Sequence, residues 1–223
     1  MPLIREFAPA KINLTLDVLG KRPDGYHEIE SLIAFASDVG DVVTLDTERP
    51  VAVSLSGPFA ASIAGANLVE TTLLLIEAHA PRLQLGAIHL EKNLPVAAGI
   101  GGGSADAAAV MRAVRKANLS NESADLLDWT ELGLRLGADV PVCLHSHLAW
   151  VTGIGETVTP AQASQHGLPA VIANPLVAVP LDKTAQVFRA LGAAPLSGTH
   201  KPSHMRPANS IMFVMARIVC NRL

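Results

Sequence analysis

The residues best suited to chemistry lie in a glycine-rich segment near the middle of the chain, residues 95–105. Four of them are glycine, at positions 99, 101, 102 and 103, and Ser104 follows directly. Glycine allows positive φ angles and the close approach of a ligand, and successive backbone N–H groups in such a turn can converge on an anion. An alanine-rich helix is expected to follow, and its first turn would add positive partial charge. The segment therefore predicts a loop that binds a phosphate chain.

Two better-known phosphate motifs do not fit this segment. A Walker A loop needs a lysine immediately before its serine or threonine, and Gly103 stands before Ser104. A dinucleotide fingerprint needs a glycine three residues after Gly101, where Ser104 stands. A flexible or tightly packed loop without a ligand has about even odds for such a cluster taken alone. The expected strand before the loop and helix after it favour phosphate binding.

Other chemistry-bearing residues stand apart from the glycine-rich segment. Apolar and polar residues alternate over 12–18, which predicts a half-buried strand with Lys11 and Asn13 on one polar face. Asp139 lies in a segment, 137–141, that is expected to turn, and aspartate alone is more often a turn residue there. Taken alone, Lys11 is more often a solvated charge. His145 and His147 have the spacing of metal ligands on a strand, but no third ligand is near, which favours no metal site.

These residues must be positioned by a mixture of strands and helices. Pattern and turn residues predict helices over 67–80, from the glycine loop to about Asn118, over 122–136 and over 182–191. Strands are expected at 12–18, 27–35, 42–47, 51–56, 87–91, 142–144, 148–152 and 170–174, with turns at 20–25, 137–141 and 153–156. The elements do not repeat as regular βαβ units, which favours the α+β class. A boundary near residue 160 would divide the chain into domains 1–160 and 161–223.

The composition excludes several classes of protein. The 223 residues carry a net charge of −3 and no block of lysine or arginine, so a nucleic-acid partner is not expected. No apolar stretch reaches the ~20 residues that a membrane-spanning helix needs. Two cysteines, Cys143 and Cys220, are too few for a disulfide framework and favour the reducing cytoplasm. The sequence is compatible with a monomer or a weak homodimer.

Four motifs resemble those of a known family. Residues 95–108, PVAAGIGGGSADAA, are similar to the P-x-x-x-G-[LI]-G-[GS]-[GS]-S-x-A loop of the GHMP kinases. Residues 8–14 (APAKINL), 22–27 (RPDGYH) and 137–141 (GADVP) are similar to motifs of one branch, the diphosphocytidyl-methylerythritol kinases. Each motif alone is modest evidence. The four follow one another in the order and spacing of that branch, and the resemblance covers residues 1 to about 200.

The resemblance implies a role for individual residues. Lys11 and Asp139 would be catalytic, with Asp139 the carboxylate near the attacking hydroxyl. Asn13, Tyr26 and His27 would hold a cytidine-diphosphate substrate, with Tyr26 stacked on the pyrimidine. Asn67 and Lys92 would lie near the adenosine of ATP. The ATP phosphates would be wrapped by Pro95, Val96, Ala97, Ala98, Gly99, Ile100, Gly101, Gly102, Gly103, Ser104 and Ala105.

The resemblance also implies a fold and a reaction. The fold would be the α+β GHMP kinase fold, with an N-terminal α/β nucleotide-binding domain like domain 2 of ribosomal protein S5 and an incomplete C-terminal α+β domain. The reaction would move the γ-phosphoryl group of ATP to the 2-hydroxyl of 4-diphosphocytidyl-2-C-methyl-D-erythritol, a small-molecule substrate. Mg²⁺ would accompany the ATP, and Ser104 is a candidate ligand of the metal.

The sequence departs from the family pattern near its end. A third glycine-rich motif, G-[ST]-G-[AST], has no counterpart after residue 200, and residues 204–223 form an apolar, basic tail unlike the family. We expect this tail to be a truncated or frameshifted end. Two alternatives to the assigned reaction follow: another GHMP kinase of small molecules, or a nucleotide-binding remnant without catalysis.

Overall fold

The computed structural model describes residues 3–63, 65, 67–162, 167, 169–174, 176 and 183–196. The chain divides into two compact units, the first from residues 1–11 and 35–146 and the second from 12–34 and 147–223. The boundary expected near residue 160 stays a prediction, and the tail from 204 lies outside the described residues.

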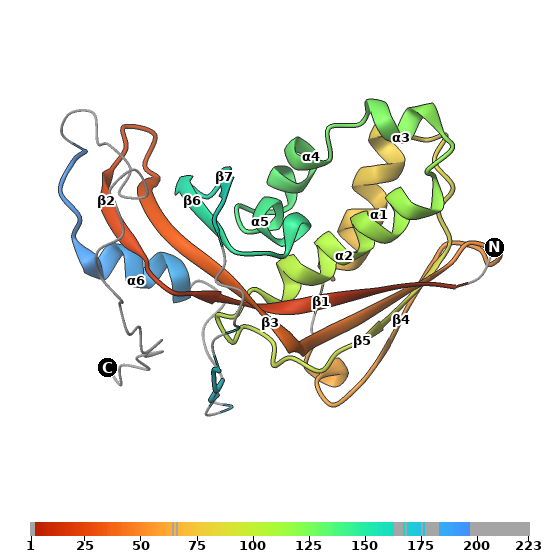
Figure 1. Ribbon diagram of the computed structural model, residues 1–223, viewed down its shortest axis with the longest axis horizontal. Coiled ribbons are helices and arrows are strands. Elements are labelled where there is room, and N and C mark those ends of the chain that lie inside the picture. Colours follow the sequence, from red (N-terminus) through yellow and green to blue (C-terminus); the bar gives the residue numbers. More distant parts are fainter. Residues whose placement is uncertain are drawn as a thin grey trace. The chain divides into compact units, whose positions relative to one another are not determined.

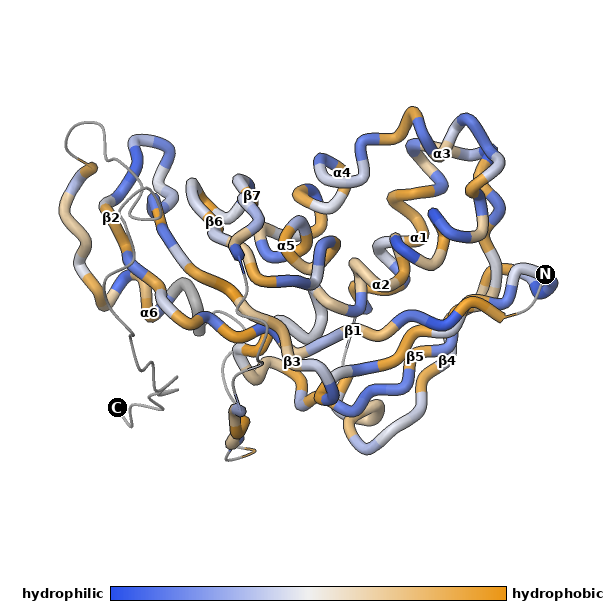
Figure 2. Tube along the Cα trace, in the orientation of Figure 1, coloured by the Kyte–Doolittle hydropathy of each residue, from blue (hydrophilic) through white to orange (hydrophobic). Residues whose placement is uncertain are grey.

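The strands of the first unit form a sheet around one long strand. Strand β1 (Ile4–Asn13) pairs with β3 (His27–Asp46), and β3 pairs antiparallel with β5 (Ala87–Glu91) through its last five residues. Strand β4 (Ala52–Ser56) lies parallel to β5. Because successive side chains of a strand point to opposite faces, the buried residues alternate along β3 and β5. They are Val43, Leu45, Ile88 and Leu90. Figure 2 shows this mixture of polar and apolar colour along β3.

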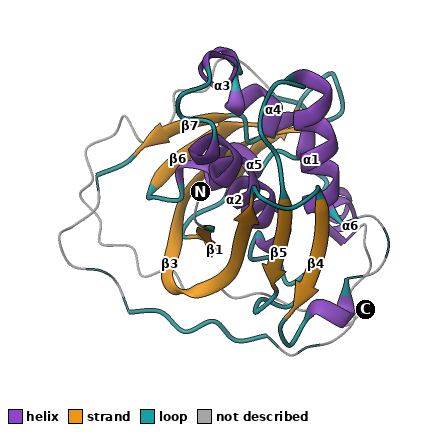
Figure 3. Cartoon of the chain, turned by 90° about the vertical axis from the view of Figure 1, so that its right-hand side faces the viewer, coloured by secondary structure: helices purple, strands orange, loops and turns teal. Residues whose placement is uncertain are grey.

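Helices cover one face of these strands, as Figures 1 and 3 show. They are α1 (Leu68–His79), α2 (Gly102–Ala117), α3 (Glu122–Leu126), α4 (Trp129–Leu136) and α5 (Val140–His145), and a 3-10 turn, η1 (Ala60–Ser62), precedes them. Helix α2 is central, since α1, α4 and α5 all pack against it. Most of its buried side chains are alanine or valine, and their small size allows neighbouring helices to approach closely. The start of α2 is thereby held in place from several sides.

The second unit is built on the first part of β3. Strand β2 (Asp17–Lys21) and strand β6 (Ala149–Gly153) each pair antiparallel with β3, and β7 (Thr157–Pro160) pairs antiparallel with β6. Helix α6 (Lys183–Leu191) belongs to the same unit. The turn after β6 is closed by the Ile154 N–H, which donates to Glu156 Oε2 at 2.5 Å. The turns predicted at 20–25 and 153–156 are confirmed, with the first shortened by β2.

Several predicted elements are confirmed with small shifts in their ends. Helix α1 begins after Asn67, whose side chain accepts from the Val69 N–H at 3.0 Å, and Pro81 follows its C-terminal cap. The alanine-rich helix runs to Ala117 with Asn118 as its cap. The strands expected at 51–56, 87–91 and 148–152 and the helix at 182–191 are also present.

Three predicted strands are wrong. The strand expected at 12–18 is interrupted, because the chain leaves the ladder between β1 and β2. There Thr15 Oγ1 accepts from the Leu32 N–H at 2.9 Å. Residues 142–144 lie in helix α5, because Pro141 occupies its first turn and the apolar side chains face α2. His145 and His147 therefore do not share a strand. Residues 170–174 are described and form no strand.

Two further differences concern continuity. The strands expected at 27–35 and 42–47 are one strand, β3, and Gly40 lies within it. A Cβ at Gly40 would come within 2.5 Å of the Ala8 carbonyl oxygen, so this glycine marks a close approach to β1, not a turn. The helix expected at 122–136 is two helices, since the Asp128 side chain accepts from the N–H groups of Thr130 and Glu131 and starts α4 afresh.

Within the described residues, no helix combines the length and the apolar character that crossing a membrane requires.

Candidate active site

The glycine-rich segment forms the loop between β5 and α2. Its φ angles are positive at three alternate residues, +56° at Ala97, +77° at Gly99 and +67° at Gly101, and not at the two residues between them. Alternation between right- and left-handed residues is the backbone arrangement in which successive N–H groups form an anion-binding concavity. Ala98 and Ile100 are buried and anchor the loop, while Gly99 and Gly103 are exposed. The geometry fits the predicted phosphate loop.

Strand β1 holds Lys11 against this loop. The Lys11 N–H donates to the Ile100 carbonyl at 2.8 Å. A Cβ at Gly101 would lie 2.9 Å from Lys11 Cβ, closer than side-chain atoms pack, so the loop approaches Lys11 in a way that only glycine permits. Two of the four motifs, which lie about 90 residues apart in the sequence, therefore meet in the structure.

The side chains of Lys11 and Asp139 form an ion pair. Lys11 Nζ lies 3.1 Å from Asp139 Oδ1, and the side chain of Lys11 is 6% exposed while that of Asp139 is 47% exposed. Asp139 is the residue before α5, yet its carboxylate makes no capping hydrogen bond to that helix. The carboxylate therefore faces solvent beside a buried ammonium group, an arrangement suited to proton transfer and to binding negative charge.

Helix α5 is held at its other end by Arg112 of α2. Arg112 Nη1 donates to the Cys143 carbonyl at 2.7 Å, Nη2 donates to the Phe7 carbonyl at 2.8 Å, and Nε donates to Glu6 Oε2 at 2.9 Å. This guanidinium group joins β1, α2 and α5, the three elements that carry Lys11, the loop and Asp139. Sequence reasoning did not find Arg112, because its partners are up to 106 residues away.

The thiol of Cys143 lies in the same helix and is fully buried. Burial, with a smaller contribution from the negative charge of Asp139, raises the pKa of Cys143 from 9.0 to about 12.

Lys92 lies beneath the loop in a buried cluster of charges. Its Nζ donates to Asp41 Oδ2 and to Asp106 Oδ2, both at 2.6 Å. Burial raises the pKa of Asp106 from 3.8 to about 7, with the Lys92 charge opposing this shift and the Asp41 charge adding to it. The role predicted for Lys92 at the adenosine stays a prediction.

Asn67, the other predicted adenosine residue, caps α1 through Oδ1. Its Nδ2 is buried and has no hydrogen-bond partner among the described residues. A buried amide donor without a partner is costly, so this atom is a candidate donor to a ligand.

The predicted substrate residues Asn13, Tyr26 and His27 belong to the second unit. Asn13 Nδ2 donates to Ser31 Oγ at 2.7 Å. Tyr26 is 60% exposed, directly after the turn that Gly25 closes with φ +91°. The His27 ring stacks on Phe188 of α6, with centroids 4.8 Å apart and an interplanar angle of 23°. Nothing in the sequence alone connected Phe188 with His27.

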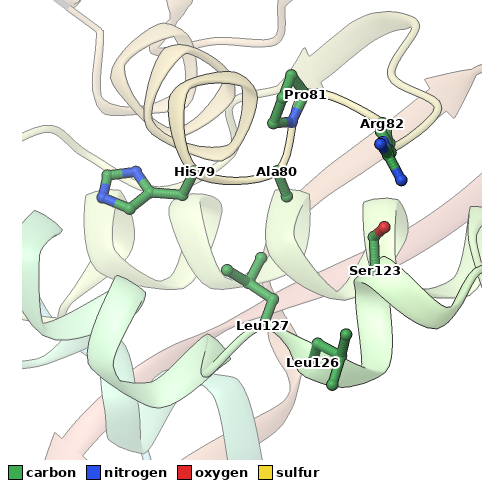
Figure 4. Close-up of a pocket in the computed structure, with 7 residues that line it drawn as sticks. All are labelled: His79, Ala80, Pro81, Arg82, Ser123, Leu126 and Leu127. Atoms are coloured by element: carbon green, nitrogen blue, oxygen red, sulfur yellow. The ribbon is translucent and has the colours of Figure 1, made fainter.

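A separate cavity of about 300 Å³ lies at the C-terminal end of α1 (Figure 4). It is lined by His79, Ala80, Pro81, Arg82, Ser123, Leu126 and Leu127. None of these residues belongs to the glycine loop or to the Lys11–Asp139 pair. Over the described part of the chain, no group of three His, Cys, Asp or Glu side chains is arranged to hold a metal ion.

Comparison with known proteins agrees with this geometry. The profile of the GHMP kinases N terminal domain matches residues 67–147. A 4-diphosphocytidyl-2-C-methyl-D-erythritol kinase of Bradyrhizobium diazoefficiens is 45% identical over 194 residues, which cover 86% of this chain and 63% of that protein. One from Methylobacterium radiotolerans is 48% identical over 195 residues, covering 86% and 65%. The chain thus spans less than two thirds of the length of these relatives.

Solved structures agree as well. The crystal structure of a 4-(cytidine 5'-diphospho)-2C-methyl-D-erythritol kinase superposes with a TM-score of 0.55 at 36% identity, over 71% of this chain and 55% of that one. A homoserine kinase from Cytophaga hutchinsonii, 18% identical with a TM-score of 0.52 over 86% and 66% of the two chains, shares the fold alone. The fold is thus the predicted α+β GHMP kinase fold. Residues 67–147 thus match the N-terminal domain of the GHMP kinases, and the chain is similar to kinases of this family over most of its length.

Proposed function

We propose that this chain transfers the γ-phosphoryl group of ATP to the 2-hydroxyl of 4-diphosphocytidyl-2-C-methyl-D-erythritol, a step of non-mevalonate isoprenoid precursor synthesis. The proposal rests on the Lys11–Asp139 pair, 3.1 Å apart, beside a loop that approaches the Lys11 side chain. The names of relatives 45–48% identical over 86% of the chain support the choice of substrate.

In this proposal the loop, residues 95–105, holds the phosphates of ATP. Its three positive φ angles and the N-terminus of α2 supply backbone N–H groups and positive partial charge. The unpartnered Asn67 Nδ2 supports a contact with the nucleoside. Phosphoryl transfer depends mostly on positioning and on stabilising charge, and this loop does both.

The chemical step needs one proton acceptor and one cation. The Asp139 carboxylate accepts the proton of the substrate hydroxyl as its oxygen bonds to the γ-phosphorus. The bond from that phosphorus to the β–γ bridging oxygen breaks, and ADP leaves. The Lys11 ammonium group stabilises negative charge on the transferred phosphoryl group and orients the Asp139 carboxylate through the ion pair.

Mg²⁺ fits this arrangement. It takes only one or two protein carboxylates and completes its shell with water and phosphate oxygens. The hydroxyl group of Ser104, in the first turn of α2, is the candidate protein ligand, while the carboxylate of Asp139 accepts the proton. When bound, the ion would neutralise charge on the phosphates.

We further propose that Asn13, Tyr26 and His27 contact the cytidine-diphosphate part of the substrate. Exposed Tyr26 offers an aromatic face, on which a pyrimidine can stack, and His27 is oriented by its stacking on Phe188. A cytoplasmic location, a monomeric or weakly dimeric state, no nucleic-acid partner and a domain boundary near residue 160 complete the proposal.

The test is a coupled assay of ADP release with 4-diphosphocytidyl-2-C-methyl-D-erythritol. Wild type should turn over. Asp139→Asn should lose roughly 10²- to 10⁴-fold in kcat with little change in the KM for ATP. Asp125→Asn, an exposed carboxylate of α3, is the matched control. An Asp139→Asn protein as active as the control would refute the catalytic role. ATP binding by wild type without any turnover would refute the kinase and leave a nucleotide-binding protein.

A further inference from the structure

The buried cluster beneath the loop joins its two ends. Asp41, on β3, accepts through Oδ1 from the N–H groups of Asn93 and Leu94 at 2.6 and 2.7 Å, where the chain enters the loop. Its Oδ2 accepts from Lys92 Nζ. The same Nζ donates to Asp106, which lies in α2 just after the loop. One unbroken series of hydrogen bonds therefore runs from residues 93 and 94 to residue 106.

The ammonium group of Lys92 also packs directly against the loop backbone. A Cβ at Gly102, the first residue of α2, would lie 3.2 Å from Lys92 Nζ. The position of α2 relative to β5 is thus set by Lys92 at the point where the N–H groups of the helix begin. A shift of this ammonium group would shift the loop.

All three side chains are buried, so no ligand can reach them. Asp41 is 0% exposed, and Lys92 and Asp106 are each 3% exposed. Both carboxylates accept from the same lysine through their Oδ2 atoms, so contacts inside the protein hold the cluster together, and Asp106 Oδ1 has no hydrogen-bond partner among the described residues. Burying these ionisable groups is costly in free energy, and a polar core cluster that is kept in spite of this cost is suited to fixing one conformation.

We propose that Asp41, Lys92 and Asp106 are positioning residues whose side chains set the glycine-rich loop in its phosphate-binding shape without touching the phosphates. This inference rests on the proposed function, because it assumes that the loop binds the phosphates of ATP. It predicts that breaking the cluster weakens recognition of the β- and γ-phosphates and leaves recognition of the nucleoside part unchanged.

The test compares binding of ATP and of AMP by calorimetry. Asp106→Ala severs α2 from Lys92 and leaves the Asp41–Lys92 pair intact. Its Kd for ATP should rise roughly tenfold or more, since small misplacements of a binding group cost up to about 10²-fold. Its Kd for AMP should stay within about twofold of wild type. Asp106→Asn keeps an oxygen that accepts from Lys92 and should restore most of the ATP affinity. Asp125→Ala, on the exposed face of α3, is the control.

Each other outcome is decisive. Unchanged ATP affinity in Asp106→Ala overturns the inference. An equal loss for ATP and AMP also overturns it, because the cluster would then act on the nucleoside or on folding as a whole. If Asp106→Ala does not fold, Asp106→Leu gives the same comparison, since its apolar side chain fills the buried space and cannot accept from Lys92. A wild-type protein that binds neither nucleotide refutes the proposed function itself, before any variant is compared.

Discussion

Two glycines of the loop, Gly101 and Gly103, differ in backbone conformation and in the space around them. Gly101 has φ +67° and lies against Lys11, whereas Gly103 has no such φ angle and meets only Leu68 Cδ2, at 3.9 Å. The sequence shows four glycines and cannot rank them. At Gly101 the contact with Lys11 requires a glycine. At Gly103 nothing among the described residues requires one, so only a ligand could.

Substitution should reveal this difference in stability. Gly101→Ala should lower the free energy of unfolding by roughly 1–3 kcal/mol, because the new Cβ would be strained in φ and would meet Lys11 Cβ. Gly103→Ala, inside α2, should be neutral or should stabilise by up to about 1 kcal/mol through helix propensity. Urea unfolding of both variants measures the difference. An equal loss of stability in the two variants would contradict the positive φ angle and the close contact assigned to Gly101.

Asp106 should make stability depend on pH. Its pKa is raised on folding, from 3.8 to about 7, so the protonated form favours the folded state. The stabilisation is complete below about pH 4 and is lost as pH rises through about 7. Asp106→Asn cannot titrate, so wild type should lose stability relative to it across this window, by on the order of a few kcal/mol. Denaturant titrations at pH 5, 6, 7 and 8 test this. If the stability of wild type and of Asp106→Asn varied with pH in the same way, the raised pKa of Asp106 would be refuted.

At the scale of elements, helices whose ends and faces are set by nearby residues could be predicted from the sequence. Asn67 predicted the start of α1, and the run of alanines after Ser104 predicted α2, because caps and periodicity act within one turn. The strand expected at 142–144 was wrong because a short apolar run does not distinguish a buried strand from a buried helix, and packing on α2 selects a helix. Pro141 in the first turn was the signal that could have corrected it.

The break between α3 and α4 offers a test at this scale. Asp128→Ala removes the acceptor for the N–H groups of Thr130 and Glu131. It should cost about 1 kcal/mol of stability, read from the urea midpoint. Asp125→Ala, in α3 and without a capping role in the described structure, is the comparison. If both variants lose the same stability, Asp128 does not start α4.

At the scale of the whole chain, resemblance carried more information than pattern. The motifs around Lys11, the loop and Asp139 pointed to one family before any contact was known, and the structure brings these three together. Asp41 and Arg112 could not be found in this way. Each lies in an ordinary stretch of sequence, and its role depends on partners that become neighbours only through folding.

Arg112 therefore tests the cohesion of the first unit. Arg112→Met removes the donors to the Phe7 and Cys143 carbonyls and one of the two cations beside Glu6. The loss should be roughly 1–3 kcal/mol, because two carbonyl groups lose a donor and the buried Glu6 carboxylate keeps only Lys116. Arg115→Met, on the exposed side of the same helix, should change stability by less than about 0.5 kcal/mol. Thermal or urea unfolding of Arg112→Met and Arg115→Met measures the difference. Equal stability of the two variants would show that the contacts of Arg112 do not stabilise the fold.

The buried thiol of α5 has a practical consequence. With its pKa near 12 and no exposure, Cys143 in the folded protein should hardly react with iodoacetamide. Alkylation at this position, followed by mass spectrometry of the peptide, would then time the opening of the helix that follows Asp139. Cys143 is therefore a natural probe of the integrity of this helix, and no label has to be engineered into the protein.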